Sequence, residues 1–228
     1  RGFDLAINLW GADHHGYVAR LKGALKAFGI EEKNLQVLLI QMVNLIEGGK
    51  LKSMSTRKGE YVELKELVRE VGVDAVRFIF LSRSHDSPLD FDVELAKKHS
   101  LENPVYYVQY AHARICSLKE KAKERGLKIE EIFESDLSKL CEDEEIEILK
   151  RLSEFSDVVE MSALGLSPYK IVYYLLELAS SFHEYYNKYK IISEDKELSL
   201  ARLALSEGCR IVIRNGLDLL GVNSPEKM

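Results

Sequence analysis

The chain has 228 residues, 46% of them apolar and 30% charged, with 32 lysines and arginines against 37 aspartates and glutamates. These proportions exclude an intrinsically disordered or collagen-like chain, and the length allows one large core or two smaller ones. No apolar run approaches the ~20 residues that a membrane helix needs. At first sight, the formal net charge of −5 argues against a nucleic-acid partner.

The first hundred residues mix strand and helix periods. Apolar runs over residues 4–10 and 36–42 predict two strands, and apolar side chains at helical spacing between them predict a helix that ends at Gly29. A strand, a helix and a strand with short connections form a βαβ unit, which implies a parallel sheet. Two short helices are expected next, over residues 64–71 and 74–81, with Asp74 as the N-cap of the second.

From about residue 93 the apolar period stays near 3.6 until the end of the chain. Long helices are predicted over residues 103–123, 144–164, 169–189 and 196–220. Asn103-Pro104 and Ser167-Pro168 are typical helix starts, and Gly221 stands where a helix ends. The predicted fold class is therefore mixed, with an α/β part over residues 1–92 and an all-α helical bundle over residues 93–228.

A polar segment follows the first predicted strand. Gly11 allows close approach to the backbone at the end of a parallel strand, where nucleotides bind. Asp13 could accept from the ribose hydroxyls, and His14 or His15 could stack on or hydrogen-bond the nucleotide. The alternative is a polar helix start with Asp13 as the N-cap. No metal site is expected there, because adjacent histidines point in different directions. The cysteines at positions 116, 141 and 209 form no CxxC pair, which favours reduced thiols in a cytoplasmic protein.

A basic stretch lies between Lys50 and Glu60, with four cations and three hydroxyls in nine residues. Such a loop could close on a polyphosphate, where cations neutralise the charge that develops on a leaving pyrophosphate. The alternative is a solvated basic turn.

Tyrosines are frequent in the helical part. Tyr107, Tyr110 and Arg114 stand at i, i+3 and i+7, on one face of a helix, and Tyr185 and Tyr189 precede Lys190. Exposed aromatic rings beside arginine or lysine form stacking surfaces for unpaired bases. The alternative is that these tyrosines belong to the core or the boundary of the bundle.

In order and spacing, several segments resemble the arginyl-tRNA synthetases, which are class I aminoacyl-tRNA synthetases. The segments are Gly11-Ala-Asp-His-His-Gly-Tyr17, Met54-Ser-Thr-Arg57-Lys-Gly59, Asn103-Pro-Val-Tyr-Tyr-Val-Gln-Tyr-Ala-His-Ala-Arg114, and Arg214-Asn-Gly-Leu-Asp-Leu-Leu-Gly221 with the ending Pro225-Glu-Lys-Met228. The resemblance covers nearly all of the chain. It implies the C-terminal half of a Rossmann-type catalytic domain, with its signature loop at residues 50–60, followed by an anticodon-binding helical domain.

The resemblance also implies an activity and its residues. The family is an ATP-dependent arginine–tRNA ligase, so the expected substrates are ATP with its accompanying Mg²⁺, L-arginine and tRNA(Arg), and we expect a monomer. Three groups of residues carry over from the family pattern. They are Gly11, Asp13, His14 and Lys52 at the ATP, Met54, Ser55, Arg57 and Lys58 in the catalytic loop, and Tyr107, Tyr110, Arg114, Tyr185, Tyr189 and Met228 around the anticodon.

Two departures from the family pattern limit this expectation. Ser53 and Thr56 stand where the class I loop has lysines, so Lys52, Arg57 or Lys58 would carry the charge instead. The histidine-glycine signature of the first Rossmann half is absent from these residues, so we expect a C-terminal fragment that is inactive alone. Two alternatives remain: a non-catalytic tRNA-binding module derived from a synthetase, and a class I synthetase for cysteine or methionine, which usually has zinc-ligand cysteines that residues 1–103 lack.

The acidic total hides an uneven distribution of charge. Residues 126–147 contain nine acidic side chains and are expected to form a solvated loop and helix surface. Elsewhere in residues 104–228 there are 15 basic and 13 acidic side chains, a slight positive excess. The net charge therefore does not exclude RNA as a partner.

Overall fold

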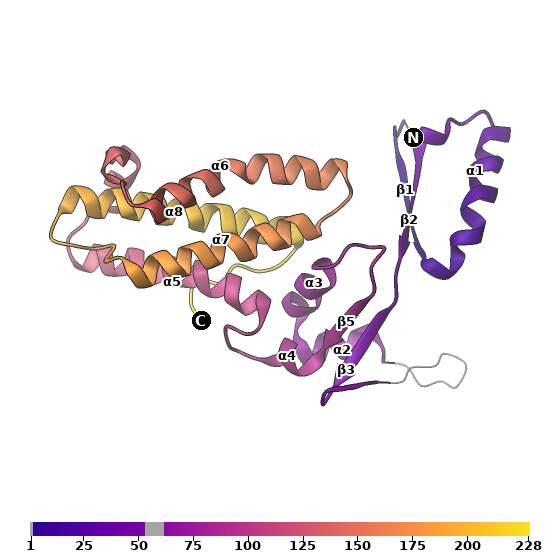
Figure 1. Cartoon of the computed structure of the whole chain (residues 1–228), viewed down its shortest axis with the longest axis horizontal. Coiled ribbons are helices and arrows are strands. Elements are labelled where there is room, and N and C mark those ends of the chain that lie inside the picture. Colours follow the sequence, from indigo (N-terminus) through magenta and orange to yellow (C-terminus); the bar gives the residue numbers. More distant parts are fainter. Residues whose placement is uncertain (1, 53–61) are drawn as a thin grey trace. The chain divides into compact units, whose positions relative to one another are not determined.

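The structure is a computed structural model that describes residues 2–52 and 62–228, and their contacts divide the chain into two compact units (Figure 1). The first unit consists of Arg1–Tyr61 and Arg83–Val93, and the second of Val62–Ser82 and Glu94–Met228. A small sheet region followed by a helical domain is the predicted fold class, which is confirmed. Within the described ranges, no helix combines the length and the apolar character that crossing a membrane would require.

The first unit contains the predicted βαβ arrangement. β1 (Ala6–Gly11) and β2 (Leu35–Ile40) pair in parallel, from Ala6 beside Leu35 to Gly11 beside Ile40. Between them lie a 3₁₀ helix η1 (Ala12–Tyr17), the helix α1 (Val18–Ala27) and a second 3₁₀ turn η2 (Glu32–Asn34). The prediction of a parallel pair is confirmed.

The second strand was predicted over residues 36–42, but in the structure it ends at Ile40, before Gln41 and Met42. There the chain leaves β2 and enters a second sheet, in which β3 (Val43–Glu47) lies between the antiparallel β4 (Lys50–Leu51) and the parallel β5 (Leu89–Asp92). The amide of Gln41 donates to the His85 carbonyl at 2.8 Å, and the Met42 carbonyl accepts from Leu89 at 3.2 Å. These backbone bonds satisfy the polar groups at the break.

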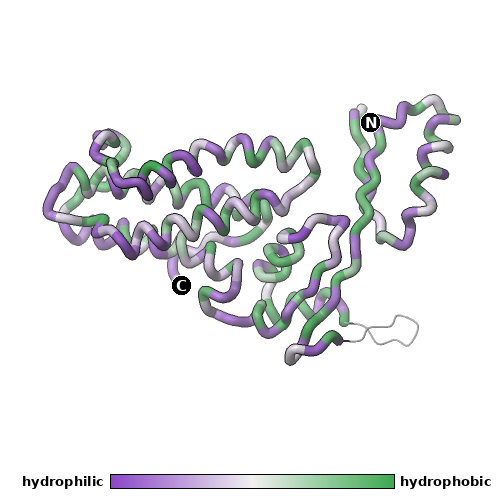
Figure 2. Tube along the Cα trace, in the orientation of Figure 1, coloured by the Kyte–Doolittle hydropathy of each residue, from purple (hydrophilic) through white to green (hydrophobic). Residues whose placement is uncertain are grey.

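The helical unit is a bundle of four long helices. They are α5 (Pro104–Glu124), α6 (Asp143–Leu164), α7 (Tyr169–Lys188) and α8 (Lys196–Leu220). Each alternates apolar and polar segments along its length (Figure 2), as expected for helices that bury one face. α8 packs against the other three, and its buried Leu203, Ile213 and Leu217 face a core to which α7 contributes Leu175 and Phe182.

Shorter elements complete this unit. α2 (Leu64–Val71) and α3 (Val73–Leu81) precede the sheet strand β5, α4 (Val93–Lys97) follows it, and the 3₁₀ turns η4 (Ile129–Glu134) and η5 (Leu137–Lys139) connect α5 to α6. α3 packs on α5, α7 and α8 because its Phe78 and neighbouring apolar side chains are buried. Contacts thus place Val62–Ser82 with the helices, and the predicted domain boundary at residue 92 stays a prediction.

Three local expectations are wrong. Gly72, not Asp74, is the N-cap of α3, and Asp74 instead accepts hydrogen bonds from Gln109 and Asn223. Ser167 does not cap α7; its hydroxyl donates to the Gly165 carbonyl. The acidic stretch is not wholly solvated, because Glu145 is completely buried. For Asp74 and Glu145 a partner far along the chain displaces the local contact, whereas Ser167 turns back to a carbonyl two residues away.

The expected helix ends at Asn103 and Gly221 are confirmed. The Asn103 side chain accepts from the amide of Val105 at 3.2 Å, and Pro104 occupies the first helical position. Gly221 has φ 66° and ψ 38°, the left-handed conformation that ends many helices. A Cβ atom there would lie 2.6 Å from the Arg77 guanidinium, so an alanine would displace this exposed side chain from its hydrogen bond to the Leu220 carbonyl.

Candidate functional site

The predicted ATP-contacting residues lie at the carboxyl end of β1. Gly11 is the last residue of that strand, and a Cβ atom there would lie 2.5 Å from a carboxylate oxygen of Asp13. Asp13 and His14 are exposed and their side chains approach to 3.7 Å, between Asp13 Oδ2 and His14 Nε2. The arrangement places a carboxylate and an imidazole in solvent beside a strand end, where ligands of parallel sheets bind. Their contact with ATP stays a prediction.

The signature loop predicted over residues 50–60 falls mostly outside the described residues. Met54, Ser55, Arg57 and Lys58 lie outside the described residues. Lys52 follows β4, and its ammonium donates to Glu47 Oε2 at 2.7 Å. Within residues 2–52 and 62–228, no three His, Cys, Asp or Glu side chains are grouped as a metal site.

The face predicted on α5 forms one cluster with two residues of α7. We call Tyr107, Tyr110, Arg114, His183 and Tyr186 the aromatic platform. The Arg114 guanidinium lies 4.6 Å from the ring centres of both Tyr110 and Tyr186, a cation–π geometry on either side. Its Nη2 donates to the Tyr110 hydroxyl at 3.2 Å. The helical spacing thus brought Tyr107, Tyr110 and Arg114 together, as predicted.

His183 orders this platform. Its Nε2 lies 3.2 Å from the Tyr107 carbonyl and its Nδ1 lies 3.1 Å from Arg114 Nη1. Because a carbonyl only accepts and a guanidinium only donates, Nε2 carries the proton and Nδ1 is the acceptor. Burial, together with the neighbouring Arg114 charge, holds the pKa of His183 below its ordinary value, although the hydrogen bond to the Tyr107 carbonyl opposes this shift. The imidazole is therefore neutral and fixes the guanidinium.

Two predicted tyrosines of α7 lie elsewhere. Tyr185 is completely buried and its hydroxyl donates to Glu145, so its assignment to an RNA-facing surface is wrong. Tyr189 is half-buried; its hydroxyl donates to Glu144 at 2.8 Å, and Arg202 lies 5.1 Å from its ring centre. Tyr186 takes the surface position instead. The sequence pattern missed it because the tyrosine pair gives no sign of which member faces inward.

Met228 lines a pocket of about 600 Å³ at the start of α5, together with Tyr106. The remaining lining residues include His99, Lys97, Lys98 and Lys227. The ring of Tyr106 is stacked on Tyr110 with centroids 6.1 Å apart, which joins this pocket to the aromatic platform. Sequence reasoning left Tyr106 and His99 out, although Tyr106 adjoins Tyr107.

The tail that carries Met228 is held by hydrogen bonds. Gln109 Nε2 donates to the Asn223 carbonyl at 2.8 Å and to Asp74 at 2.9 Å, and the Asn223 amide donates to Asp74 at 3.2 Å. His112 Nδ1 donates to the Pro225 carbonyl at 3.0 Å. The end of the chain is thus fastened to α3 and α5, and Met228 stays about half exposed (48%) beside the pocket.

Known proteins match both the helical unit and the whole chain. Residues 108–228 match the family model of the DALR anticodon binding domain. The chain is 52% identical over 228 residues to the arginine–tRNA ligase of Carboxydothermus hydrogenoformans and 52% identical over 230 residues to that of Desulfosudis oleivorans, covering 100% of this chain and 41% of each relative. The chain thus spans about two fifths of the length of these curated relatives.

Solved structures show the same likeness. The arginyl-tRNA synthetase of Thermus thermophilus superposes with a TM-score of 0.77 at 26% identity, over 99% of this chain and 41% of that chain. A solved structure from Campylobacter jejuni superposes with a TM-score of 0.90 at 36% identity, over 100% of this chain and 49% of that one. The chain therefore belongs to the DALR anticodon-binding domain family, and its whole length is similar to the C-terminal region of arginyl-tRNA synthetases.

Proposed function

We propose that this chain is part of an arginine–tRNA ligase and that its helical unit binds the anticodon arm of tRNA(Arg). The observation that carries the proposal is the aromatic platform, in which half-buried tyrosines surround a fixed arginine. Only two of the five N–H donors of Arg114 are used in the bonds to His183 and Tyr110. The guanidinium can therefore still donate to RNA, and the rings stack bases without first having to be ordered.

The reaction would have two steps. The carboxylate of arginine attacks the α-phosphorus of ATP, which forms arginyl-adenylate and releases pyrophosphate. A ribose hydroxyl of the tRNA terminus then attacks the acyl carbon, and AMP leaves. Gly11, Asp13, His14 and Lys52 would contact ATP, which binds with its Mg²⁺. Met54, Ser55, Arg57 and Lys58 would contact the phosphates from the signature loop.

The 228-residue chain alone is proposed to be inactive, and the whole enzyme to be a cytoplasmic monomer. Support comes from β1, which pairs only with β2 among the described strands and leaves Leu9 66% exposed. A nucleotide site on such a sheet lacks the neighbouring strands that usually enclose it. An ATP–pyrophosphate exchange assay with arginine and tRNA tests the proposal, and clear turnover by this chain would contradict it.

Binding of the anticodon stem-loop tests the proposed RNA surface directly. Replacing Tyr110 or Arg114 by alanine should weaken binding by about 1–3 kcal/mol if a base stacks there. Tyr173→Ala is the matched control, because Tyr173 is an exposed tyrosine of α7 outside the platform. Equal affinity for stem-loops with unrelated anticodons would argue against the platform as an anticodon-binding surface.

A further inference from the structure

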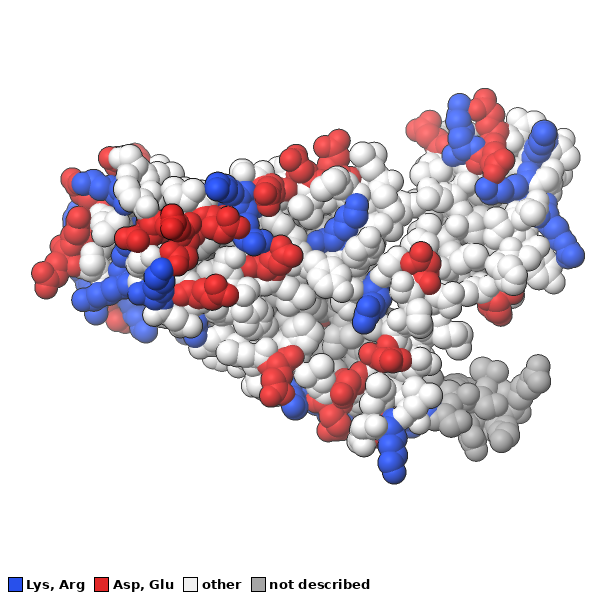
Figure 3. Space-filling view, viewed as in Figure 1, with Lys and Arg blue, Asp and Glu red and all other residues white. Residues whose placement is uncertain are grey.

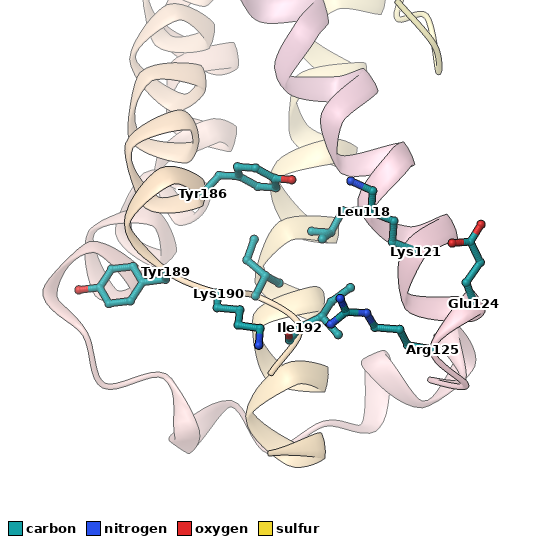
Figure 4. A pocket seen from close by; sticks show the side chains of 9 residues that line it. Leu118, Lys121, Glu124, Arg125, Tyr186, Tyr189, Lys190 and Ile192 are labelled. Atoms are coloured by element: carbon teal, nitrogen blue, oxygen red, sulfur yellow. Dashed lines mark hydrogen bonds between the residues drawn. The ribbon is translucent and has the colours of Figure 1, made fainter. Parts of the chain in front are cut away.

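A second recess lies on the helical unit, beyond the aromatic platform along α5. We call it the basic pocket. It has a volume of about 500 Å³ and lies between the last turns of α5, the end of α7 and the segment that leads to α8 (Figure 4). Its lining residues are Leu118, Lys121, Glu124, Arg125, Tyr186, Tyr189, Lys190, Ile191 and Ile192.

The charges of this pocket converge. The Lys121, Arg125 and Lys190 side chains point inward across its mouth, whereas the Glu124 carboxylate points away (Figure 4). Among the described residues, none of these three cations has a carboxylate within 4.0 Å, although most other lysines of the bundle do. Three uncompensated cations around one recess favour an anion, because their mutual repulsion falls when a negative charge enters.

The wall that carries Lys190 is held in place. Arg202 Nη1 donates to the Lys190 carbonyl at 3.1 Å, and Arg125 Nη1 donates to the Ile192 carbonyl at 3.4 Å. The side chains of Ile191 and Ile192 are buried and form the floor. The segment after α7 is thus fixed at two carbonyls and by apolar burial, so the pocket needs little ordering before a ligand binds.

The basic pocket continues the aromatic platform. Arg114, Lys121 and Arg125 stand at i, i+7 and i+11 on α5, and a rise of about 1.5 Å per residue puts Lys121 roughly 10 Å along the axis from Arg114. Tyr186 belongs to both, because it contacts Arg114 and lines the pocket. On the face of the helical unit seen in Figure 3, acidic and basic side chains lie next to one another, as expected where lysines pair with glutamates.

We propose that the basic pocket binds a backbone phosphate of the RNA whose unpaired bases stack on the aromatic platform. This inference rests on the proposed function. Lysine and arginine bind phosphate through charge-assisted hydrogen bonds, and the continuity with the platform makes RNA the occupant rather than an acidic peptide. The pocket would add affinity but no sequence specificity. Phosphate contacts only position the RNA, whereas contacts to the bases determine which sequence binds.

The test compares the 228-residue chain with the variant Lys121→Ala/Arg125→Ala/Lys190→Ala, using the anticodon stem-loop of tRNA(Arg) over a series of salt concentrations. All three residues are exposed, and the one structural contact described for them, from Arg125 to the Ile192 carbonyl, lies outside the helices, so the helical circular dichroism should not change. Affinity at low salt should fall on the order of tenfold. The slope of the logarithm of the association constant against the logarithm of the salt concentration should become shallower by about 1, because one phosphate contact is lost. Lys150→Ala is the matched control, because Lys150 lies beside Asp143, Glu144 and Glu147.

Neutral methylphosphonate linkages, placed singly along the stem-loop, identify the phosphate. One position should weaken binding to the unmodified chain and have no effect on the triple variant. If the triple variant binds with unchanged affinity and slope, the inference is overturned while the proposed function stands, and the pocket is left to an acidic ligand other than RNA. If the unmodified chain does not bind the stem-loop, both fail.

Discussion

The buried pair of Glu145 and Arg202 allows a sharp prediction about stability. Glu145 is completely buried, and its Oε1 accepts from Arg202 Nε at 2.8 Å and from the Tyr185 hydroxyl at 3.1 Å. Its Oε2 accepts from the Glu142 amide at 3.1 Å, which forms part of the capping box of α6. The carboxylate is thus fully hydrogen-bonded by three elements.

Arg202→Met removes the guanidinium and keeps an apolar stem of similar length. A buried carboxylate that loses its cation costs about 3–5 kcal/mol of the free energy of unfolding. For a chain of this size each kcal/mol corresponds to about 2–4 °C, so the melting temperature should fall by roughly 6–20 °C. The Lys190 carbonyl also loses the Arg202 donor, which acts in the same direction.

Urea unfolding followed by helical circular dichroism measures the change. The triple variant Glu145→Leu/Tyr185→Phe/Arg202→Met is the companion, because it leaves neither a charge nor a hydroxyl unpaired. It should recover the lost stability except for the cost of the Glu142 amide and the Lys190 carbonyl, which lose their partners. The reasoning is refuted if Arg202→Met costs less than about 1 kcal/mol. It is also refuted if the companion is as unstable as the single variant.

Two further predictions concern His183 and Gly221. Burial lowers the pKa of His183 in the folded state below its ordinary value of 6.5, so the stability that it contributes is present above that value and is lost as the pH falls through the folded pKa. The variant His183→Gln should therefore show a shallower loss of stability between about pH 8 and about pH 5 in urea unfolding, whereas an unchanged pH profile would contradict a neutral His183. Gly221→Ala should cost the about 1–2 kcal/mol of a left-handed alanine and, in addition, the hydrogen bond from Arg77 to the Leu220 carbonyl, because its Cβ would displace the guanidinium. Gly126→Ala, with φ 77° and open space, is the control that measures the backbone cost alone in urea unfolding.

The helix bounds could be predicted closely because several local signals agree there. The helices α2 and α8 have the predicted bounds, 64–71 and 196–220, since an apolar period of 3.6 coincides with Gly72 and Gly221 just beyond the ends. Asn103 caps α5 through a contact two residues away. Interactions this close in sequence can be inferred from the residues alone.

Two of the errors arise where partners lie far apart in the sequence. Asp74 has a typical N-cap position, yet its carboxylate binds Asn223, which is 149 residues away. Glu145 belongs to an acidic stretch that reads as solvated, and Arg202, 57 residues further on, buries it. No local pattern signals either partner, because both contacts depend on how the helices pack.

The two adjacent tyrosines of α7 show how a contact in the core determines which side chain reaches the surface. Neighbouring helical residues point about 100° apart, so burying Tyr185 against Glu145 necessarily turns Tyr186 toward Arg114 on α5. Arg202 donates to both Glu145 and the Lys190 carbonyl, so the residue that pairs with the acceptor of Tyr185 also holds the rim of the basic pocket. A buried ion pair contributes little net stability compared with an apolar core of the same volume. What the pair adds here is position, because it links Tyr185 of α7 to Arg202 of α8 and to the Lys190 carbonyl at the rim of the basic pocket.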